Sequence, residues 1–310
     1  MALYVVTGGA GFIGSHLVEE LLRRGQSVRI ADDFSSGQRE NVPAGVELVE
    51  GDIADPAIAR KAIAGADYVL HQAAIPSVAR SVTDPVTSHH ANVDGTLQVL
   101  VAARDHNVRR VVMAGSSSEY GDSPTLPKHE EMPLAPKSPY ALQKVTGEEY
   151  CRLFTQLYGL ETVSTRYFNV FGPRQQPNSA YSGIISLFIK ALSSGTPPLI
   201  LGDGEQTRDF TYVANVVDGV LRACTAPRAS GQAINVATNG RISLLDLLAT
   251  LNRVMGTSAV PEFGPARQGD VKDSQAAIGK AKELLGYEPI VDFEEGLRRT
   301  VAWYRTANAS

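Results

Sequence analysis

The feature that most constrains the fold is a glycine-rich turn near the start of the chain, which reads TGGAGFIG over residues 7–14. An apolar, β-branched run precedes it at 3–7, and an apolar stretch with helical spacing follows at 13–24. Glycines let a strand-to-helix turn close tightly and let its backbone approach a pyrophosphate at the helix N-terminus. This context predicts a dinucleotide-binding βα unit. Two glycine registers fit the pattern: Gly9/Gly11/Gly14 and Gly8/Gly11/Gly14.

Short apolar runs alternate with helical stretches over the first half of the chain. Near-continuous Val, Leu and Ile runs are typical of a parallel sheet that is covered on both faces. Regular alternation with helices indicates βαβ units, so we expect an α/β fold with a Rossmann-type, doubly wound parallel sheet. The predicted strands are 3–7, 27–31, 46–50, 68–72, 110–116 and 161–167, and the predicted helices are 13–24, 57–64, 92–106 and 139–157.

The pattern changes after Phe171, where glycines and prolines break the chain into short pieces. We therefore expect a second, smaller α/β domain that binds the substrate, formed by 172–207 and 225–310. The larger, cofactor-binding domain would then comprise 1–171 together with roughly 208–224. Five prolines between residues 124 and 139 predict a long surface loop within this larger domain.

Composition excludes several classes of protein. A chain that is 43% hydrophobic and 20% charged is not intrinsically disordered. A net charge of −4 gives no indication of a nucleic-acid or anionic-membrane partner. No apolar run approaches the roughly 18–20 residues of a membrane span, and the first residues lack the features of a signal peptide. Two cysteines, Cys151 and Cys224, cannot form a disulfide framework, so we expect a cytoplasmic protein.

Acidic residues follow the second and third predicted strands, where the adenosine of a dinucleotide would lie. A carboxylate of Asp32-Asp33 is placed to reach the adenosine ribose hydroxyls. No Arg or Lys follows until Arg39, so a ribose phosphate would be repelled and NAD is favoured over NADP. Asp52 and Ile53 are placed to meet the adenine, although such an aspartate more often caps a loop.

Tyr140 and Lys144 share one helical face, one turn apart. A lysine ammonium and a cationic nicotinamide would stabilise the phenolate and lower the pKa of Tyr140 below its ordinary value of about 10. That would make Tyr140 a general base near neutral pH. Ser116 ends a predicted strand, at the sheet edge where α/β folds bind ligands. The three side chains predict a catalytic set beside an NAD site.

Other chemistries find no support. No Gly-x-Ser-x-Gly nucleophile elbow is present, which disfavours acyl transfer. The histidines lack metal-ligand spacing, His89-His90 is expected at the start of a helix, and no metal is predicted. The six histidines are His16, His71, His89, His90, His106 and His129.

Ordered motifs along nearly the whole chain resemble the extended short-chain dehydrogenase/reductase family, and within it the NAD-dependent nucleotide-sugar epimerases. The motifs are TGGAGFIGSHL at 7–17, DDFSSG at 32–37, HQAA at 71–74, SSSEYG at 116–121, YALQK at 140–144, RYFNVFGP at 166–173, GDGEQTRDF at 202–210 and RQGDVKDSQA at 267–276.

The resemblance implies roles for individual residues, with Ser116, Tyr140 and Lys144 as the catalytic triad. The implied cofactor contacts are Gly8, Gly11, Phe12, Ile13, Gly14, Asp32, Asp33, Phe34, Ser35, Ser36, Gly37, Asp52, Ile53, Gln72, Ala73, Ala74, Tyr140, Lys144, Tyr167 and, near the nicotinamide pocket, Asn92. The implied substrate contacts are Ser77, Ser116, Ser117, Tyr140, Gln175 and Ser274 around the sugar, Asn169 on the sugar diphosphate, Arg208 and Arg267 on the phosphates, Asp270 on the uridine ribose, and Leu199, Ile200 and Leu201 along the uracil.

The resemblance also implies a reaction, the inversion of C4 in a UDP-hexose. Tyr140 would take the 4-hydroxyl proton while hydride passes from C4 to NAD. The 4-keto sugar would then turn over and receive the hydride on its other face. NAD is regenerated in each turnover, so it can stay bound.

Departures from the family pattern refine the expected substrate. Dehydratases of the family carry an Asp-Glu pair where this chain has Ser117-Ser118, and Glu119, one place further on, should point elsewhere. Ser274 stands where glucose-only epimerases often carry a bulky tyrosine, so an N-acetyl group should fit, with Ser77, Ser117 and Gln175 available to bind it. Pro76 stands where some glucose epimerases have a lysine near the cofactor, which leaves the tightness of NAD binding open.

Two alternatives remain open from the sequence. A UDP-glucuronate epimerase or decarboxylase would need a cation near the sugar carboxylate, which Arg80 or Lys128 would have to supply. A non-catalytic NAD-binding regulator would have no use for the intact catalytic triad. The family commonly forms homodimers, and the helices expected at 87–106 and 140–157 would provide a four-helix interface here.

Overall fold

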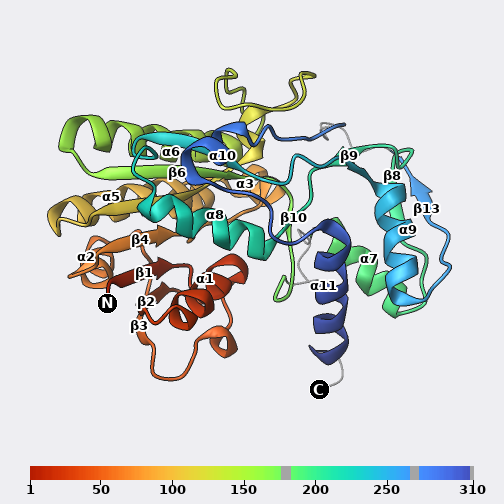
Figure 1. The fold of residues 1–310 in the computed structure, drawn as a ribbon, viewed down its shortest axis with the longest axis horizontal. Helices are drawn as coiled ribbons and strands as arrows, with labels where there is room; N and C mark the ends of the chain where they lie inside the picture. Colours follow the sequence, from red (N-terminus) through yellow and green to blue (C-terminus); the bar gives the residue numbers. More distant parts are fainter. Residues whose placement is uncertain (176–182, 266–271, 308–310) are drawn as a thin grey trace.

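A seven-stranded parallel sheet forms the centre of the larger part of the molecule (Figure 1). The structure, a computed structural model, describes residues 1–175, 183–265 and 272–307. All six predicted strands are present, which confirms the Rossmann-type, doubly wound α/β prediction. In spatial order the strands are β11 (Gln232–Val236), β6 (Glu161–Tyr167), β5 (Arg110–Ser116), β4 (Tyr68–His71), β1 (Leu3–Thr7), β2 (Ser27–Asp32) and β3 (Glu47–Glu50).

Helices cover both faces of this sheet because successive strand side chains point to opposite sides. Val5 of β1 packs with the first layer of helices and Val6 with the second, and both are fully buried. The first layer contains α2 (Pro56–Ile63), α5 (Gly95–Asp105) and α6 (Pro139–Tyr158), and the second contains α1 (Phe12–Arg23) and α8 (Val213–Thr225).

The helix predicted at 92–106 begins earlier than expected. The segment α4 (Pro85–His89), a π-helical turn (His90–Asp94) and α5 follow one another without a break. The histidine pair predicted at a helix start therefore lies inside a continuous helix. His90 reaches across to Asp52, with 3.2 Å between its Nε2 and a carboxylate oxygen.

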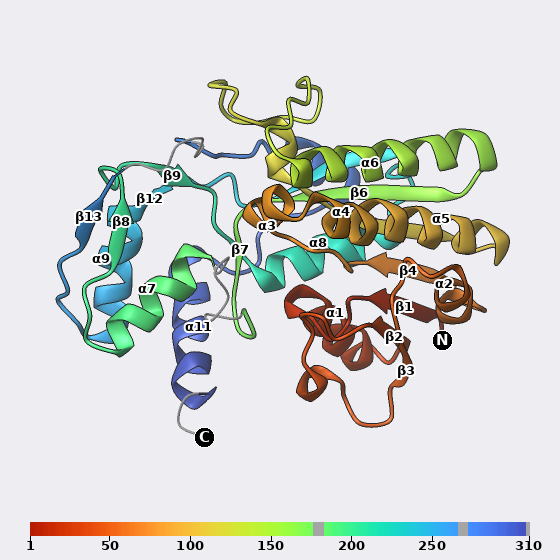
Figure 2. The ribbon, with the colours of Figure 1, turned by 180° about the vertical axis from the view of Figure 1, so that it is seen from behind.

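A smaller group of elements lies beyond the end of the sheet to which the strand arrows point (Figure 2). It is built from short pieces, as the frequent glycines and prolines of this region predict. Its strands pair as β7 (Val170–Phe171) with β10 (Thr211–Tyr212), β8 (Leu199–Leu201) with β13 (Glu262–Gly264), and β9 (Thr207–Arg208) with β12 (Ile242–Ser243). Its helices are α7 (Ile184–Ser193), α9 (Leu244–Met255) and α11 (Phe293–Ala307). The helix α10 (Gly279–Leu285) instead packs against β11 and α8 of the larger part, although the sequence assigns it to the smaller domain.

One strand of the large sheet falls in the range that the sequence assigns to the smaller domain. β11 lies within 225–310, yet it pairs in parallel with β6, with Gln232 opposite Val163. The helix α8 provides the crossover that a parallel strand of the same sheet requires. Residues 232–236 therefore belong with the larger domain, while the rest of the two-domain division stays a prediction.

Candidate active site

The carboxyl ends of neighbouring strands bring the predicted site residues to one edge of the sheet. Thr7 at the end of β1 lies beside Ala31 of β2 and His71 of β4. Ser116 ends β5 directly beside Tyr167, the last residue of β6. Ligands of open α/β sheets bind at this edge, so the register alone gathers cofactor and catalytic candidates.

The glycine-rich turn is as tight as its sequence predicts. Gly8 has a φ of +67°, and a Cβ on Gly14 would lie 2.1 Å from the Gly8 carbonyl oxygen. A Cβ on Gly11 would meet only that same oxygen, at 3.2 Å. The packing within the protein therefore tolerates a side chain at position 11 better than at position 14. No side chain caps the N-terminus of α1, which leaves its first amides suited to an anion. The turn fits a dinucleotide pyrophosphate.

Asp32 ties this turn to the segment that follows β2. Its two carboxylate oxygens accept the backbone N–H groups of Ala10 and Phe34, both at 2.9 Å. The residue is 7% exposed, and burial raises the pKa of its carboxyl. Asp33 is exposed and accepts the N–H and hydroxyl of Ser35. The contact between Asp32 and the ribose stays a prediction. Backbone N–H groups already orient the carboxylate that would make it.

Asp52 and Ile53 follow β3, as expected for residues near an adenine. One Asp52 oxygen accepts the N–H of Ala54 at 2.9 Å, so the aspartate does cap its loop. Ile53 is 7% exposed, with Gly95 of α5 close to its side chain. The proposed adenine contact is not tested by these contacts.

A buried histidine, absent from the predicted site, fixes the turn against the segment after β4. His71 bridges two hydroxyls, with Nδ1 2.7 Å from Thr7 Oγ1 and Nε2 3.0 Å from Thr96 Oγ1. Burial lowers the pKa of His71 to about 3, so the ring is neutral. Thr7 Oγ1 also accepts the N–H of Ala73 at 3.2 Å. This series of side-chain hydrogen bonds holds the HQAA motif in place. In the sequence, only that motif indicates a role for His71.

Gln72 and Asn92 occupy predicted cofactor positions in different ways. The Gln72 side-chain oxygen accepts the Tyr167 hydroxyl at 3.2 Å, while its buried Nε2 has no hydrogen-bond partner among the residues that the structure describes. Asn92 is 3% exposed; its oxygen accepts the Ile75 N–H at 2.7 Å, and its amide donates to Gln143 at 2.8 Å. Asn92 thus shapes the pocket by clamping the loop after β4, whereas Gln72 keeps a donor available for a ligand.

The catalytic candidates meet at the sheet edge. Lys144 Nζ donates to the Ala114 carbonyl at 2.9 Å and lies 5.9 Å from the centre of the Tyr140 ring. Burial lowers the pKa of Lys144 to about 8. The Ser116 hydroxyl lies 2.8 Å from the Ser118 hydroxyl. The N–H of Tyr140 donates to a hydroxyl of α3 (Val78–Thr83), which anchors the start of α6.

The predicted lowering of the Tyr140 pKa is absent from the protein alone. Burial raises that pKa to about 12, and the Ser116 hydroxyl only partly opposes the rise. The Lys144 ammonium is turned to a carbonyl rather than to the phenol. A positive charge close to the phenol, such as that of a bound nicotinamide, would lower this pKa.

Three predicted substrate residues come together in the smaller group of elements. Asn169 Nδ2 donates to the carbonyl of Asp209 at 3.3 Å, and Arg208 immediately precedes that residue. The Ser274 N–H donates to the Thr207 carbonyl at 3.0 Å. Arg267 and Asp270 lie outside the described residues.

Asp209 organises this region, although the sequence did not single it out. It is fully buried and accepts the N–H and hydroxyl of Thr238 at 3.0 and 2.6 Å, and the N–H of Ala276 at 3.1 Å. Burial raises the pKa of its carboxyl. Its only signal in the sequence is its place in the GDGEQTRDF motif.

Other predicted substrate residues have their side chains engaged by the protein. Gln175 donates to the Val170 carbonyl at 3.0 Å, and Ser77 caps α3. Ile200 is fully buried, so only its neighbours Leu199 and Leu201, which are 54% and 38% exposed, present a face to a ligand. Strand alternation explains this split of the expected apolar run.

Within the described residues, no group of three His, Cys, Asp or Glu side chains is arranged to hold a metal ion. The same part of the chain contains no helix with the length and apolar character needed to cross a membrane.

Comparisons with known proteins agree with the geometry. The model of the NAD dependent epimerase/dehydratase family matches residues 4–237. A UDP-glucose 4-epimerase of Mycolicibacterium smegmatis is 40% identical, over 97% of this chain and 98% of its own. A UDP-N-acetylglucosamine 4-epimerase of Methanobrevibacter ruminantium, in complex with UDP-N-acetylmuramic acid, is 37% identical with a TM-score of 0.95 over 99% of both chains. A Thermus thermophilus UDP-glucose 4-epimerase in complex with NAD is 37% identical with a TM-score of 0.90, over 98% of this chain and 99% of its own. The chain belongs to the NAD-dependent epimerase/dehydratase family.

Proposed function

We propose that the chain is an NAD-dependent UDP-hexose 4-epimerase, which interconverts UDP-glucose with UDP-galactose and UDP-N-acetylglucosamine with UDP-N-acetylgalactosamine. The observation that carries this proposal is the meeting of Ser116, Tyr140 and Lys144 at the carboxyl edge, beside the glycine turn. Full-length similarity to UDP-sugar 4-epimerases supports it.

Several features of the chain fit NAD as the cofactor. The turn at Gly8 and the uncapped start of α1 suit a pyrophosphate, and Gln72 keeps an unpartnered buried donor nearby. The carboxylate of Asp32 suits bare ribose hydroxyls and opposes a ribose phosphate. When bound, NAD supplies the hydride acceptor and a positive charge.

Each catalytic residue then has one task. Tyr140 takes the proton of the sugar 4-hydroxyl and later returns one to the 4-keto sugar. Ser116 offers a hydroxyl next to that phenol and polarises the same sugar oxygen. Lys144, fixed by the Ala114 carbonyl, adds positive charge that favours the phenolate.

The substrate range rests on Ser274, whose small side chain should leave space for an N-acetyl group. Of the cations that the glucuronate hypothesis requires, Lys128 is 3% exposed and its ammonium donates to the Ser123 carbonyl. That engagement argues against Lys128 as the cation of a uronate site, which leaves Arg80 as the other candidate. The catalytic triad favours an enzyme over a regulator.

We also propose a cytoplasmic homodimer that pairs through 87–106 and 140–157. Cys151 and Cys224 are free, buried thiols, as suits a reducing compartment. Large apolar side chains are exposed on α6, among them Leu153 and Leu157 at 37% and 67%. Burying such a patch is the usual basis of a dimer interface.

The direct test is to incubate the purified protein with each UDP-sugar and resolve the epimers by chromatography. We expect conversion of both the plain and the N-acetylated pair without added reductant, since NAD is regenerated. A preparation replete with NAD that converts none of these sugars would contradict the proposal.

A further inference from the structure

Glu119 is a fully buried carboxyl directly behind the catalytic serine, and the mechanism above does not use it. It lies in the short 3-10 turn Ser117–Tyr120 that follows β5. Its Oε1 accepts the backbone N–H of Ser116 at 2.6 Å, and Ser116 Oγ in turn accepts the N–H of Ser118 at 3.2 Å. This reciprocal capping box fixes the backbone that carries the catalytic hydroxyl.

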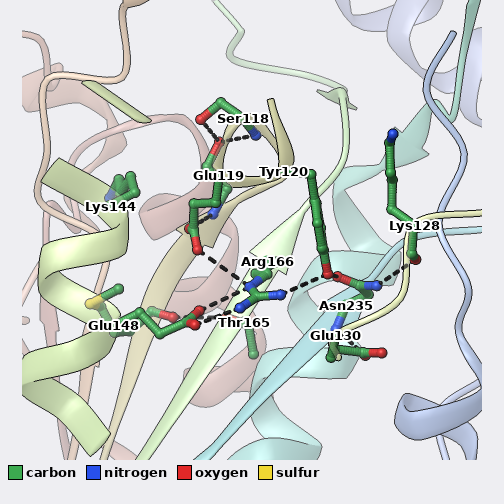
Figure 3. Close-up of polar contacts among 12 residues, drawn as sticks. Ser118, Glu119, Tyr120, Lys128, Glu130, Lys144, Glu148, Thr165, Arg166 and Asn235 are labelled. Atoms are coloured by element: carbon green, nitrogen blue, oxygen red, sulfur yellow. Dashed lines mark hydrogen bonds and ion pairs between the residues drawn. The ribbon is translucent and has the colours of Figure 1, made fainter. Parts of the chain in front are cut away.

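The other oxygen of Glu119 faces a buried cation that is already engaged. Arg166 donates to both oxygens of Glu148, at 2.9 and 2.5 Å, and to the Tyr120 hydroxyl at 2.8 Å (Figure 3). Oε2 of Glu119 lies 3.3 Å from Arg166 Nε but receives no hydrogen bond within the described part of the chain. Two buried carboxyls therefore share one guanidinium, and Glu148 takes its aligned donors.

This arrangement favours a neutral Glu119. A second buried carboxylate without a cation of its own would be strongly unfavourable. Burial and the charge of Glu148 raise the pKa of Glu119 to about 8, against the opposing effects of Arg166 and the Ser116 N–H. The proton belongs on Oε2, because Oε1 accepts the Ser116 N–H. The titratable and charged groups that face Glu119 are Arg166, Glu148, Tyr140 and Lys144.

We propose that Glu119, held as a neutral acid, is a positioning residue for catalysis: it fixes Ser116 through Oε1 and leaves the space behind Tyr140 and Lys144 without a negative charge. Its ionisation would place a charge that raises the pKa of Tyr140 and so lowers the fraction of Tyr140 present as phenolate. The same charge raises the pKa of Lys144. The kinetic consequence rests on the proposed epimerase function, whereas the protonation state does not.

Glu130 provides a matched control on the same polar network. It is a partly buried glutamate that accepts the backbone N–H of Asn235 at 2.8 Å, and Asn235 accepts the Tyr120 hydroxyl at 2.7 Å (Figure 3). Burial raises the pKa of Glu130 as well. It has no hydrogen bond to the serine turn, so a merely structural role of the network would respond to both glutamates alike.

The test compares kcat and KM for UDP-glucose between about pH 6 and about pH 10 in Glu119→Gln, Glu119→Leu and Glu130→Gln. We expect Glu119→Leu to lower kcat by about 10- to 100-fold with little change in KM, because the Ser116 hydroxyl is no longer held in its orientation. Glu119→Gln should restore most of this loss at neutral pH, since its amide oxygen can accept the same N–H. Above about pH 8 the parent should fall several-fold relative to Glu119→Gln, as Glu119 ionises only in the parent. Glu130→Gln should keep the parent's pH profile.

Superimposable pH profiles of the parent and Glu119→Gln would overturn the proposal, as would a stable Glu119→Leu with unaltered kcat. Infrared spectroscopy of protein with isotope-labelled glutamate adds a measurement that needs no UDP-sugar. We expect the carbonyl stretch of a protonated carboxylic acid at neutral pH, its loss on titration through about pH 8, and its absence in Glu119→Gln. If the band is present and no sugar is converted, the epimerase proposal fails while a neutral Glu119 stands. If the band is missing in the parent, the inference about Glu119 fails whatever the activity.

Discussion

The two halves of the site are held in place by different means. On the cofactor side, Thr7, His71 and Ser116 reach the edge because parallel strands of one large sheet end there together. On the sugar side, three two-stranded sheets replace that frame. There a single buried carboxylate, Asp209, accepts the donors that hold Thr238 and Ala276 in position.

The structural effect of a single substitution should therefore stay local on the cofactor side and extend to neighbouring segments on the sugar side. Removing a side chain from the large sheet leaves the backbone register intact. The chemical function of that side chain is then lost, while the sheet that supports the site is preserved. A side chain removed from Asp209 takes away part of the frame itself.

The largest effect should come from Tyr140→Phe, a purely chemical loss on the sheet-supported side. Removing the phenolic oxygen while keeping the ring should lower kcat by about 10²- to 10⁴-fold. The melting temperature and NAD affinity should stay close to those of the parent. Tyr158→Phe, at a 52% exposed position of the same helix, is the control and should leave kcat unaltered. Near-parental turnover in Tyr140→Phe would remove it as the base.

Asp209→Ala should show the opposite pattern on the sugar side. It leaves one buried and two partly buried donors without their acceptor, which should lower the free energy of unfolding by about 3 kcal/mol. KM for the UDP-sugar should rise while NAD affinity changes little. Asp273→Ala is the matched control, because this carboxylate is 25% exposed and should cost less. Equal losses of the two variants in denaturant unfolding would contradict the organising role of Asp209.

Two glycines of the turn separate packing from ligand binding. Gly14→Ala places a methyl group against the backbone of Gly8, so we expect a stability loss of about 1–3 kcal/mol and at least about tenfold weaker NAD binding. Gly11→Ala meets less resistance from the protein and should weaken NAD binding with little loss of stability. Calorimetric titration with NAD and thermal unfolding measure both. Equal stability of the two variants would contradict the packing argument.

The smallest effect concerns the space beside the sugar. Ser274→Tyr should lower kcat/KM for UDP-N-acetylglucosamine by about tenfold, since overfilling a formed site costs about 1–3 kcal/mol. Turnover of UDP-glucose should change little, because it lacks the bulky group. Parallel kinetics on the two substrates decide the matter: an equal response would take Ser274 out of the sugar pocket.

The cofactor half was predictable because periodic apolar runs and glycine chemistry are local signals. The turn at 7–14, the six strands and the face shared by Tyr140 and Lys144 all follow from spacing along the chain. The strand at 232–236 was not predicted as part of the large sheet, because the other strands of that sheet lie far away in the sequence.

The sugar half was less predictable because its contacts are individual and long-range. Asp209 accepts the N–H of Ala276, and the Gln175 side chain donates to the Val170 carbonyl. No periodic pattern in the sequence predicts either contact. The pKa of Tyr140 also needed the structure, since burial rather than the neighbouring Lys144 dominates it.

The π-helical turn at His90–Asp94 has a consequence for how this chain tolerates insertions and deletions. A π-turn accommodates one residue more than regular α-helical winding, and each helical residue adds about 100° of rotation. Deleting one residue here would therefore return the turn to regular winding and leave the two flanking helical faces close to their present directions. The same deletion within α5 would rotate the residues that follow by about 100°. Val99 and Leu100, both fully buried, would then leave the interior. A change of length is thus tolerated at the π-turn and not in the helix that follows it.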